Sequence, residues 1–337
     1  MIEVENINGR LGSFELRDIN LSVEPGEYRV ILGPTGAGKS VLIEYMVGIL
    51  SPDGGDIRIN GRDILSLAME DRNIGYVPQD YALFPNMDVE KNLAYGLEAR
   101  GFSPGETQRR VDQWVELLHI ESIRHRMPLN LSGGEKQRVA LGRALAVSPE
   151  IVLMDEPLSA LDENLRWEMA GELRRIQKET RATFIHISHN FEEAADVADK
   201  ITIMDHGSVA QTGSLAELMA APSSPFVAAF LKTRNIFSAR GREKGVELGG
   251  RLLETDVSRK GDLTLAIRPE HVRLFPNGDA GANVFPARVT SCRFKPSHTE
   301  VGLDAFVPLV AHVPHGGEIR EGQDLFLQIP REKMILI

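Results

Sequence analysis

The stretch that decides the fold is Gly33-Pro34-Thr35-Gly36-Ala37-Gly38-Lys39-Ser40, a full match to the pattern G-x-x-x-x-G-K-[ST]. It follows an apolar run at residues 28–32 and opens a helix-like segment at residues 39–50. Glycines let the backbone curl so that successive N–H groups face a phosphate, and the helix N-terminus adds positive potential. Lys39 supplies a charge for the β- and γ-phosphates, and Ser40 a hydroxyl for Mg²⁺. We therefore predict a loop that binds ATP with Mg²⁺.

Two carboxylates end another apolar run, at residues 151–154. Alone, Asp155 and Glu156 could simply end a strand in solvent. Beside a phosphate-binding loop, an acid at this place reaches Mg²⁺ directly or through water, and we assign this role to Asp155. The adjacent Glu156 would then polarise the attacking water.

The segment Leu131-Ser132-Gly133-Gly134-Glu135 precedes a strongly helical run. Ser132 and Glu135 have the spacing of a capping box, which predicts a well-capped helix start. The N–H groups of Gly133 and Gly134, with the helix dipole, also suit a second anion site. Both interpretations can hold together.

The pattern of apolar and polar residues changes near residue 231. Before it, apolar strand-like runs at 28–32, 151–154 and 183–187 alternate with helical patterns at 137–146 and 165–178, and 201–211 predicts a hairpin. This alternation predicts an α/β domain whose parallel sheet is covered on both faces. Later runs, at 263–267, 287–292 and 325–329, are short and separated by Gly and Pro, which predicts a small all-β domain. We place the domains at 1–234 and 235–337.

Composition limits the function classes. The chain has 337 residues, with 38 basic against 48 acidic ones and a formal charge of −10, which argues against a nucleic-acid partner. The single cysteine, Cys292, excludes an internal disulfide and fits a reducing compartment. No apolar run reaches the length of a membrane span, and the N-terminus lacks the pattern of a signal peptide. Any membrane role is therefore expected to come through a partner.

Together these motifs resemble those of the ABC ATPase family, over residues 1 to about 230. The LSGGE segment, residues 131–135, is similar to the ABC signature, although Glu135 departs from the commoner Gln. Gln79 matches the Q-loop glutamine that senses Mg²⁺ and the permease, and His189 matches the switch histidine that contacts the γ-phosphate. Asp162 ends a segment similar to the D-loop, Ser159-Ala160-Leu161-Asp162, and Phe14 occupies the place of the aromatic that stacks on adenine.

The resemblance implies three sets of site residues. The catalytic set is Glu156, His189, Lys39 and Gln79. The Mg²⁺ ligands are Ser40, Gln79 and Asp155. The nucleotide-binding set is Phe14, Gly33, Pro34, Thr35, Gly36, Ala37, Gly38, Lys39, Ser40, Ser132, Gly133, Gly134, Glu135 and Asp162.

The resemblance also implies partners. In this family two ATPase domains meet head to tail, with ATP between the P-loop of one and the signature of the other. One chain with one of each needs a homodimer or a similar subunit. Closure would pass to integral membrane permease subunits through the surface after Gln79, with residues 84–96 as docking region; packing within the domain is the alternative for Phe84 and Pro85. The chain would lie peripherally on the cytoplasmic face of the inner membrane, and meet an external solute-binding protein only indirectly.

Residues 266–271, Ala-Ile-Arg-Pro-Glu-His, resemble the RPE stretch of the TOBE domain, an OB-like barrel in importer ATPases. The implied architecture is an α/β P-loop ABC ATPase domain with a smaller all-β C-terminal domain. Residues 27–39, 81–86 and 289–313 are most similar to the molybdate/tungstate group. Importers of ferric ion, sulfate, polyamine or sugar are the alternatives. In the molybdate/tungstate group this domain can bind the oxyanion. Donors for it could be Arg288, Arg293, Lys295 and Ser297, with a solvated basic sheet edge as the simpler interpretation.

Three other functions compete with transport. A soluble ABC ATPase acting on nucleic acid would carry a long coiled coil between P-loop and signature, but only about ninety residues separate them here, without sustained heptads. A ribosome-associated relative would carry two ATPase domains. A catalytically dead regulatory protein is disfavoured because Lys39, Asp155, Glu156 and His189 are all present.

Overall fold

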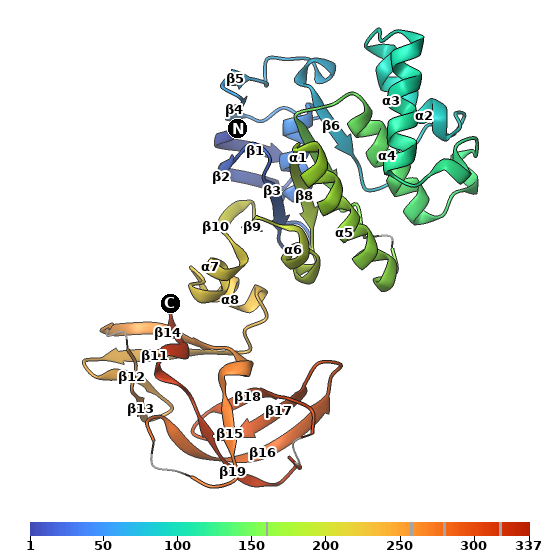
Figure 1. Cartoon of the computed structure of the whole chain (residues 1–337). Coiled ribbons are helices and arrows are strands. Elements are labelled where there is room, and N and C mark those ends of the chain that lie inside the picture. Colours follow the sequence, from blue (N-terminus) through green and yellow to red (C-terminus); the bar gives the residue numbers. More distant parts are fainter. Residues whose placement is uncertain (160, 257–258, 279–280, 317–318) are drawn as a thin grey trace. The chain divides into compact units, whose positions relative to one another are not determined.

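The computed structural model describes residues 1–159, 161–256, 259–278, 281–316 and 319–337. The chain divides into two compact units, Met1–Leu215 and Ala216–Ile337, which Figure 1 shows in blue to yellow and in yellow to red. In the described residues, no helix has the length and apolar character that crossing a bilayer requires.

The first unit is built on a six-stranded sheet in the order β10-β9-β3-β8-β7-β6. Its strands are β3 (Tyr28–Leu32), β6 (Ile74–Val77), β7 (Ile151–Asp155), β8 (Thr183–Ser188), β9 (Lys200–Asp205) and β10 (Ser208–Gly213). All neighbours are parallel except β9 and β10, which form the predicted hairpin. Every residue of β3, β7 and β8 is buried, as expected for strands covered on both faces. These strands confirm the predicted apolar runs.

A second, antiparallel sheet of the first unit was not predicted. Its strands are β1 (Ile2–Leu11), β2 (Phe14–Val23), β4 (Gly54–Ile59) and β5 (Arg62–Asp63), in the order β2-β1-β4-β5. One hydrophobic core contains side chains of this sheet, of helix α1 (Lys39–Val47) and of β3, β7 and β8. Helix α1 is therefore buried between the two sheets, and this fixes the glycine loop that precedes it.

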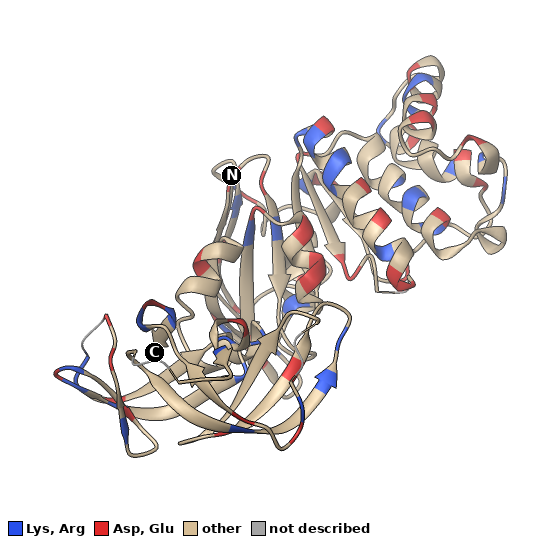
Figure 2. Cartoon of the chain, turned by 60° about the horizontal axis from the view of Figure 1, so that its bottom comes forward, with Lys and Arg blue, Asp and Glu red and all other residues tan. Residues whose placement is uncertain are grey.

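The remaining helices of this unit begin at side-chain caps. They are α2 (Val89–Ala99), α3 (Pro104–Leu117), α4 (Gly133–Ala146), α5 (Glu163–Thr180) and α6 (Phe191–Val197). The predicted capping box at α4 is confirmed, because Glu135 N donates to Ser132 Oγ at 3.3 Å and Ser132 N donates to Glu135 Oε2 at 2.7 Å. Along these helices acidic and basic residues are interspersed, as Figure 2 shows.

The described residues of the second unit form β-strands, apart from short helices at its start and single 3-10 turns at Pro269–His271 and Arg331–Lys333. One sheet has the order β13-β12-β11-β14-β20 and the other β15-β19-β16-β17-β18, and all pairs are antiparallel. The strands are β11 (Asn235–Arg242), β12 (Gly245–Leu248), β13 (Arg251–Leu253), β14 (Gly261–Ile267), β15 (Arg273–Phe275), β16 (Val284–Phe294), β17 (Thr299–Asp304), β18 (Pro308–Val313), β19 (Asp324–Gln328) and β20 (Met334–Leu336). Both sheets contribute to one core, consistent with the predicted OB-like barrel.

The start of the second unit contains α7 (Leu215–Ala220) and α8 (Pro225–Phe230). The Arg268 guanidinium, which is buried, donates to the carbonyls of Met219 at 3.1 Å and Leu231 at 3.4 Å. These bonds explain why the compact unit begins before its first strand, at Asn235. The functional boundary at 234/235 stays a prediction.

Candidate active site

Three segments with predicted roles meet because their strands are neighbours. Strand β8 lies between β3 and β7, with Ser188 opposite Leu32 and Ile187 opposite Asp155. The glycine loop follows β3, Glu156 follows β7 and His189 follows β8. In parallel sheets the carboxyl ends of adjacent strands face the same crevice, which is the usual ligand site.

A cleft of about 550 Å³ opens at this edge of the sheet. Nine predicted residues line it: Phe14, Thr35, Gly36, Gly38, Lys39, Ser40, Gln79, Glu156 and His189. Sequence reasoning missed Leu11 and Val41, which also line it. Leu11 pairs with Phe14 across the β1–β2 turn and is exposed; the only signal in the sequence was that this apolar residue lies close along the chain to the predicted adenine contact.

Two glycines of the loop cannot be replaced without strain. Gly38 has a φ of 97°, and a Cβ there would lie 2.5 Å from the Leu16 side chain and 2.6 Å from that of Phe14. At Gly33 a Cβ would lie 2.4 Å from the backbone oxygen of Met204. The loop therefore needs both the left-handed conformation and the absence of a side chain.

Lys39 is buried in the loop it follows. Its Nζ donates to the carbonyls of Gly33 at 2.8 Å and Pro34 at 3.0 Å. Burial lowers the pKa of Lys39, while the nearby carboxylates of Glu156 and Asp155 oppose this shift. A desolvated ammonium interacts more strongly with a phosphate than one in bulk water.

Ser40 and Asp155 approach each other from different elements. Ser40 Oγ donates to Asp155 Oδ1 at 3.2 Å. Burial raises the pKa of Asp155, the Ser40 hydrogen bond opposes this, and the charge of Glu156 adds to it. A desolvated carboxylate beside a hydroxyl is a fitting pair of ligands for a hard divalent cation.

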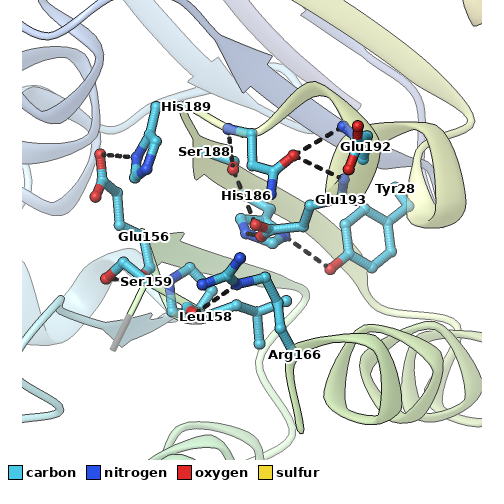
Figure 3. A network of polar contacts seen from close by, with 12 residues as sticks. Tyr28, Glu156, Leu158, Ser159, Arg166, His186, Ser188, His189, Glu192 and Glu193 are labelled. Carbon is cyan, nitrogen blue, oxygen red and sulfur yellow. Dashed lines mark hydrogen bonds and ion pairs between the residues drawn. The ribbon is translucent and has the colours of Figure 1, made fainter. Parts of the chain in front are cut away.

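Glu156 and His189 are in direct contact. His189 Nδ1 lies 3.1 Å from Glu156 Oε1, as Figure 3 shows. The backbone of Glu156 is left-handed, with a φ of 45°, and its N–H donates to the carbonyl of Ile187 at 3.1 Å. The Ser159 hydroxyl donates to the Glu156 carbonyl at 2.8 Å. A non-glycine residue in this conformation is held by its surroundings and is typical of functional sites.

The signature-like segment and Asp162 lie outside the cleft. Residues 132–135 form the capped start of α4, and Asp162 caps α5 by accepting from Leu165 N at 3.0 Å. Ala160, in the D-loop-like segment, falls outside the described residues. None of these residues lines the cleft of the same chain, so this part of the predicted site is not brought together with the P-loop.

Arg143 is a contact that sequence reasoning missed. Its guanidinium donates to the carbonyls of Ala82 at 2.6 Å and Tyr81 at 2.9 Å, and lies 5.1 Å from the centroid of the Phe84 ring. Tyr81 and Ala82 are both left-handed, so Arg143 holds an unusual backbone in the segment after Gln79. Phe84 also packs on Tyr95, with ring centroids 4.4 Å apart, and Tyr95 is exposed.

The predicted oxyanion donors of the second unit do not form one pocket. Arg288 lies 4.0 Å from Asp324, and Arg293 lies 3.9 Å from Glu300. The cavity that Arg288 lines includes neither Arg293, Lys295 nor Ser297. This arrangement favours the simpler interpretation, a solvated basic edge.

Comparison with known proteins agrees with this geometry. The family model described as ABC transporter matches residues 16–159, and that of the TOBE domain matches residues 265–337. Relatives include the molybdate/tungstate import ATP-binding protein WtpC of Pyrococcus horikoshii, which is 39% identical over 335 residues, 97% of this chain and 96% of that protein. The sulfate/thiosulfate import ATP-binding protein CysA of Synechocystis is 42% identical over 236 residues, 70% of this chain and 66% of that protein. The Fe(3+) ions import ATP-binding protein FbpC of Agrobacterium fabrum is 34% identical over 343 residues, 99% and 96% of the two chains.

Among solved structures, the ATP-binding cassette MJ0796, a dimer bound to ADP and Pi in a post-hydrolysis state, matches with a TM-score of 0.58 and 27% identity. The match covers 64% of this chain and 99% of that one. The predicted fold class is confirmed, and a nucleotide is the expected ligand of the cleft. The chain therefore belongs to the ABC transporter family, as an import ATP-binding protein with a C-terminal TOBE domain.

Proposed function

We propose that this chain is the ATP-hydrolysing motor subunit of an importer of molybdate or tungstate. The observation that supports this solute is the sequence identity of each relative taken together with the share of the chain that it covers. The WtpC relative is 39% identical across 97% of the chain, through the TOBE domain, whereas the ferric-ion relative is 34% identical over a similar length. The sulfate relative matches only 70% of the chain.

The proposed nucleotide site follows from the geometry of the cleft. The backbone N–H groups of residues 35–40 and Lys39 Nζ hold the phosphates, and Phe14 packs on the adenine. Support for Phe14 comes from its position on the cleft wall beside Gly38. Glu156 accepts a hydrogen bond from the attacking water and aligns it with the γ-phosphate, which His189 contacts from its place beside Glu156.

Mg²⁺ fits the residues at the end of β7. Ser40, Asp155 and Gln79 would hold it, as one hydroxyl, one buried carboxylate and one amide oxygen. Such a small set leaves coordination positions for phosphate oxygens and water, which Mg²⁺ prefers. When bound, the ion neutralises charge on the β- and γ-phosphates. Lys39 is the only lysine or arginine among the residues that line the described cleft. Without Mg²⁺, no other lysine or arginine of this lining is near the γ-phosphate.

We further propose that the working form is a homodimer on the cytoplasmic face of the membrane, against permease subunits. The support is the position of residues 132–135 and Asp162 outside the cleft of their own chain, together with the dimeric cassette among the similar structures. Residues 84–96, where Tyr95 is exposed, are the proposed permease contact. Residues 235–337 act as a regulatory domain, with the transported oxyanion as its candidate ligand.

The experiment that tests the solute is elemental analysis of a gene deletion. Cells grown with scarce molybdate and tungstate are assayed for Mo, W, Fe and S by mass spectrometry against the parent. We expect a selective loss of Mo or W, restored by high external oxyanion and by the wild-type gene but not by its Glu156→Gln form. A loss of Fe or S would keep the motor and discard the solute. No change in any of the four would point to an organic solute such as a polyamine or sugar.

A further inference from the structure

A buried polar network lies directly beneath the His189 loop. The Tyr28 hydroxyl lies 3.1 Å from His186 Nδ1, and His186 Nε2 lies 2.6 Å from Glu193 Oε1. Tyr28 and His186 are fully buried, and the Glu193 side chain is 5% exposed. Figure 3 shows these residues gathered below Ser188 and His189.

The network continues into the backbone that carries His189. The Ser188 hydroxyl donates to Glu193 Oε2 at 3.1 Å and accepts from Asn190 N at 2.9 Å. Asn190 Oδ1 accepts from the N–H groups of Glu192 at 2.9 Å and Glu193 at 3.4 Å, which caps α6. Both neighbours of His189 are therefore fixed by hydrogen bonds. By contrast, the His189 side chain is 57% exposed, and it makes a polar contact with Glu156.

Stability alone is a poor explanation for such a network. Burying an ion pair costs desolvation free energy, and apolar residues of similar volume are often as stable or more so. Burial raises the pKa of Glu193, but the charge and hydrogen bond of His186 and the hydrogen bond of Ser188 outweigh it, and the pKa is lowered. The carboxylate therefore stays ionised, and a buried ionised group is costly unless its hydrogen-bond partners are correctly placed.

Arg166 links the same region to the segment that follows Glu156. Its guanidinium donates to the carbonyls of Leu161 at 2.8 Å and Leu158 at 3.4 Å. Arg166 and Glu193 also line one small cavity, with Asn190. The segment after Glu156 is therefore held from α5 by Arg166, the segment that carries His189 is held from α6 by Glu193, and these two side chains line the same small cavity.

We propose that Ser188 and Glu193 are positioning residues, which hold the backbone of residues 188–190 so that the His189 imidazole stays against Glu156. This inference rests on the proposed function, because it assumes that His189 acts in ATP hydrolysis. Its physical content is specific. An exposed imidazole has few contacts of its own, so its place is set by the main chain, and the main chain is set by the Ser188 hydroxyl and the Glu193 carboxylate.

The test compares two hydroxyls at opposite ends of strand β8 in the full-length chain. Ser188→Ala removes the hydroxyl that accepts from Asn190 N. Thr183→Val is the matched control, because Thr183 Oγ1 is also buried and accepts a backbone N–H, that of Gly26 at 3.0 Å, far from the cleft. We expect Ser188→Ala to lower kcat between about tenfold and a hundredfold with KM for ATP nearly unchanged. Thr183→Val should lose thermal stability by a similar amount but keep its kcat.

Further variants separate a positioning role from an effect on stability alone. Ser188→Thr retains the hydroxyl and should restore most of kcat. Should Thr not fit the buried position, as a lowered Tm would show, Glu193→Gln against Glu193→Leu makes the same comparison, because the Gln oxygen still accepts from Ser188. In a His189→Ala background, Ser188→Ala should cause no further loss, since it acts only through His189.

An equal loss in the presence and absence of the His189 side chain would overturn the positioning role. So would a wild-type kcat for Ser188→Ala beside an impaired His189→Ala. If His189→Ala itself left kcat unchanged, the role of His189 in the proposed function would fail, and the inference with it.

Discussion

Glu156 and His189 directly follow neighbouring parallel strands, and the carboxylate of one lies 3.1 Å from the imidazole of the other. A second contact joins the same two segments, from Glu156 N to the carbonyl of Ile187 at 3.1 Å. The distance between the two side chains is thus set by the sheet. A base that must align one water molecule benefits from such a fixed reference, because misplacement of a catalytic group costs rate steeply.

Replacing Glu156 with Gln should trap ATP and stop turnover. The amide keeps the shape of the side chain but cannot accept a proton from water, which should lower kcat by about a hundredfold or more. Phosphate release gives kcat, and nucleotide retained on the purified protein gives binding. Undiminished hydrolysis would refute the role assigned to Glu156, and lost ATP binding would indicate a damaged cleft instead.

The sequence predicted those parts of the site that depend on local pattern. The glycine loop, the strand before it and the Ser132–Glu135 capping box are each encoded within about ten residues, and each is confirmed as structure. The β2-β1-β4-β5 sheet was missed because its β1–β2 hairpin is bulged, with register shifts between Val4 and Gly9, and because its β1–β4 pairing is non-local. Arg143 lies about sixty residues from the carbonyls it binds, a separation that no sequence period reveals.

His186 is the clearest case of a residue whose role the sequence pattern does not reveal. In the sequence it interrupts an apolar strand, and only its fold partners, Tyr28 on β3 and Glu193 on α6, show it to be the centre of a network. Residues 132–135 were predicted to act with the P-loop of a second copy, and within one chain they do not line the P-loop cleft. Testing that pairing needs a second copy.

Gly38→Ala should impair both folding and nucleotide binding. The left-handed backbone at this position costs an L-residue about 1–2 kcal/mol, and the added Cβ would meet the side chains of Leu16 and Phe14. Gly171→Ala is the opposite case, because Gly171 lies within α5, with a negative φ and open space around its Cβ, and should stabilise by about 0.5–1 kcal/mol. Urea unfolding and binding of a fluorescent ATP analogue measure both. Equal behaviour of the two variants would contradict the strain at Gly38.

Asp199 should make the free energy of unfolding of the protein decrease as the pH falls. Burial raises its pKa, but the hydrogen bond of Arg174 and that of Tyr28 N outweigh burial, so the folded pKa lies below the ordinary 3.8. The unfolded chain then binds the proton first as pH falls, so the contribution of Asp199 is full above pH of about 4 and is lost through the folded pKa below it. Asp199→Asn should be less stable at pH 7 and lose less between pH of about 5 and 3. Urea titrations at several pH values test this. An equal decrease in the free energy of unfolding for both proteins over the acidic range would contradict it.

Mixing two inactive variants tests whether the active site is shared between chains. Lys39→Ala disables the phosphate loop, and Ser132→Arg places a bulky cation at the exposed start of α4. If each site joins the loop of one chain to the signature segment of its partner, a mixed dimer holds one site with both defects and one intact site. Random pairing then leaves about a quarter of all sites intact, so ATPase activity should rise well above that of either variant alone. Circular dichroism of each variant controls for folding. If every site were complete within one chain, the mixture would show only the average of the two variants, because in that arrangement pairing cannot bring an intact loop to an intact signature segment.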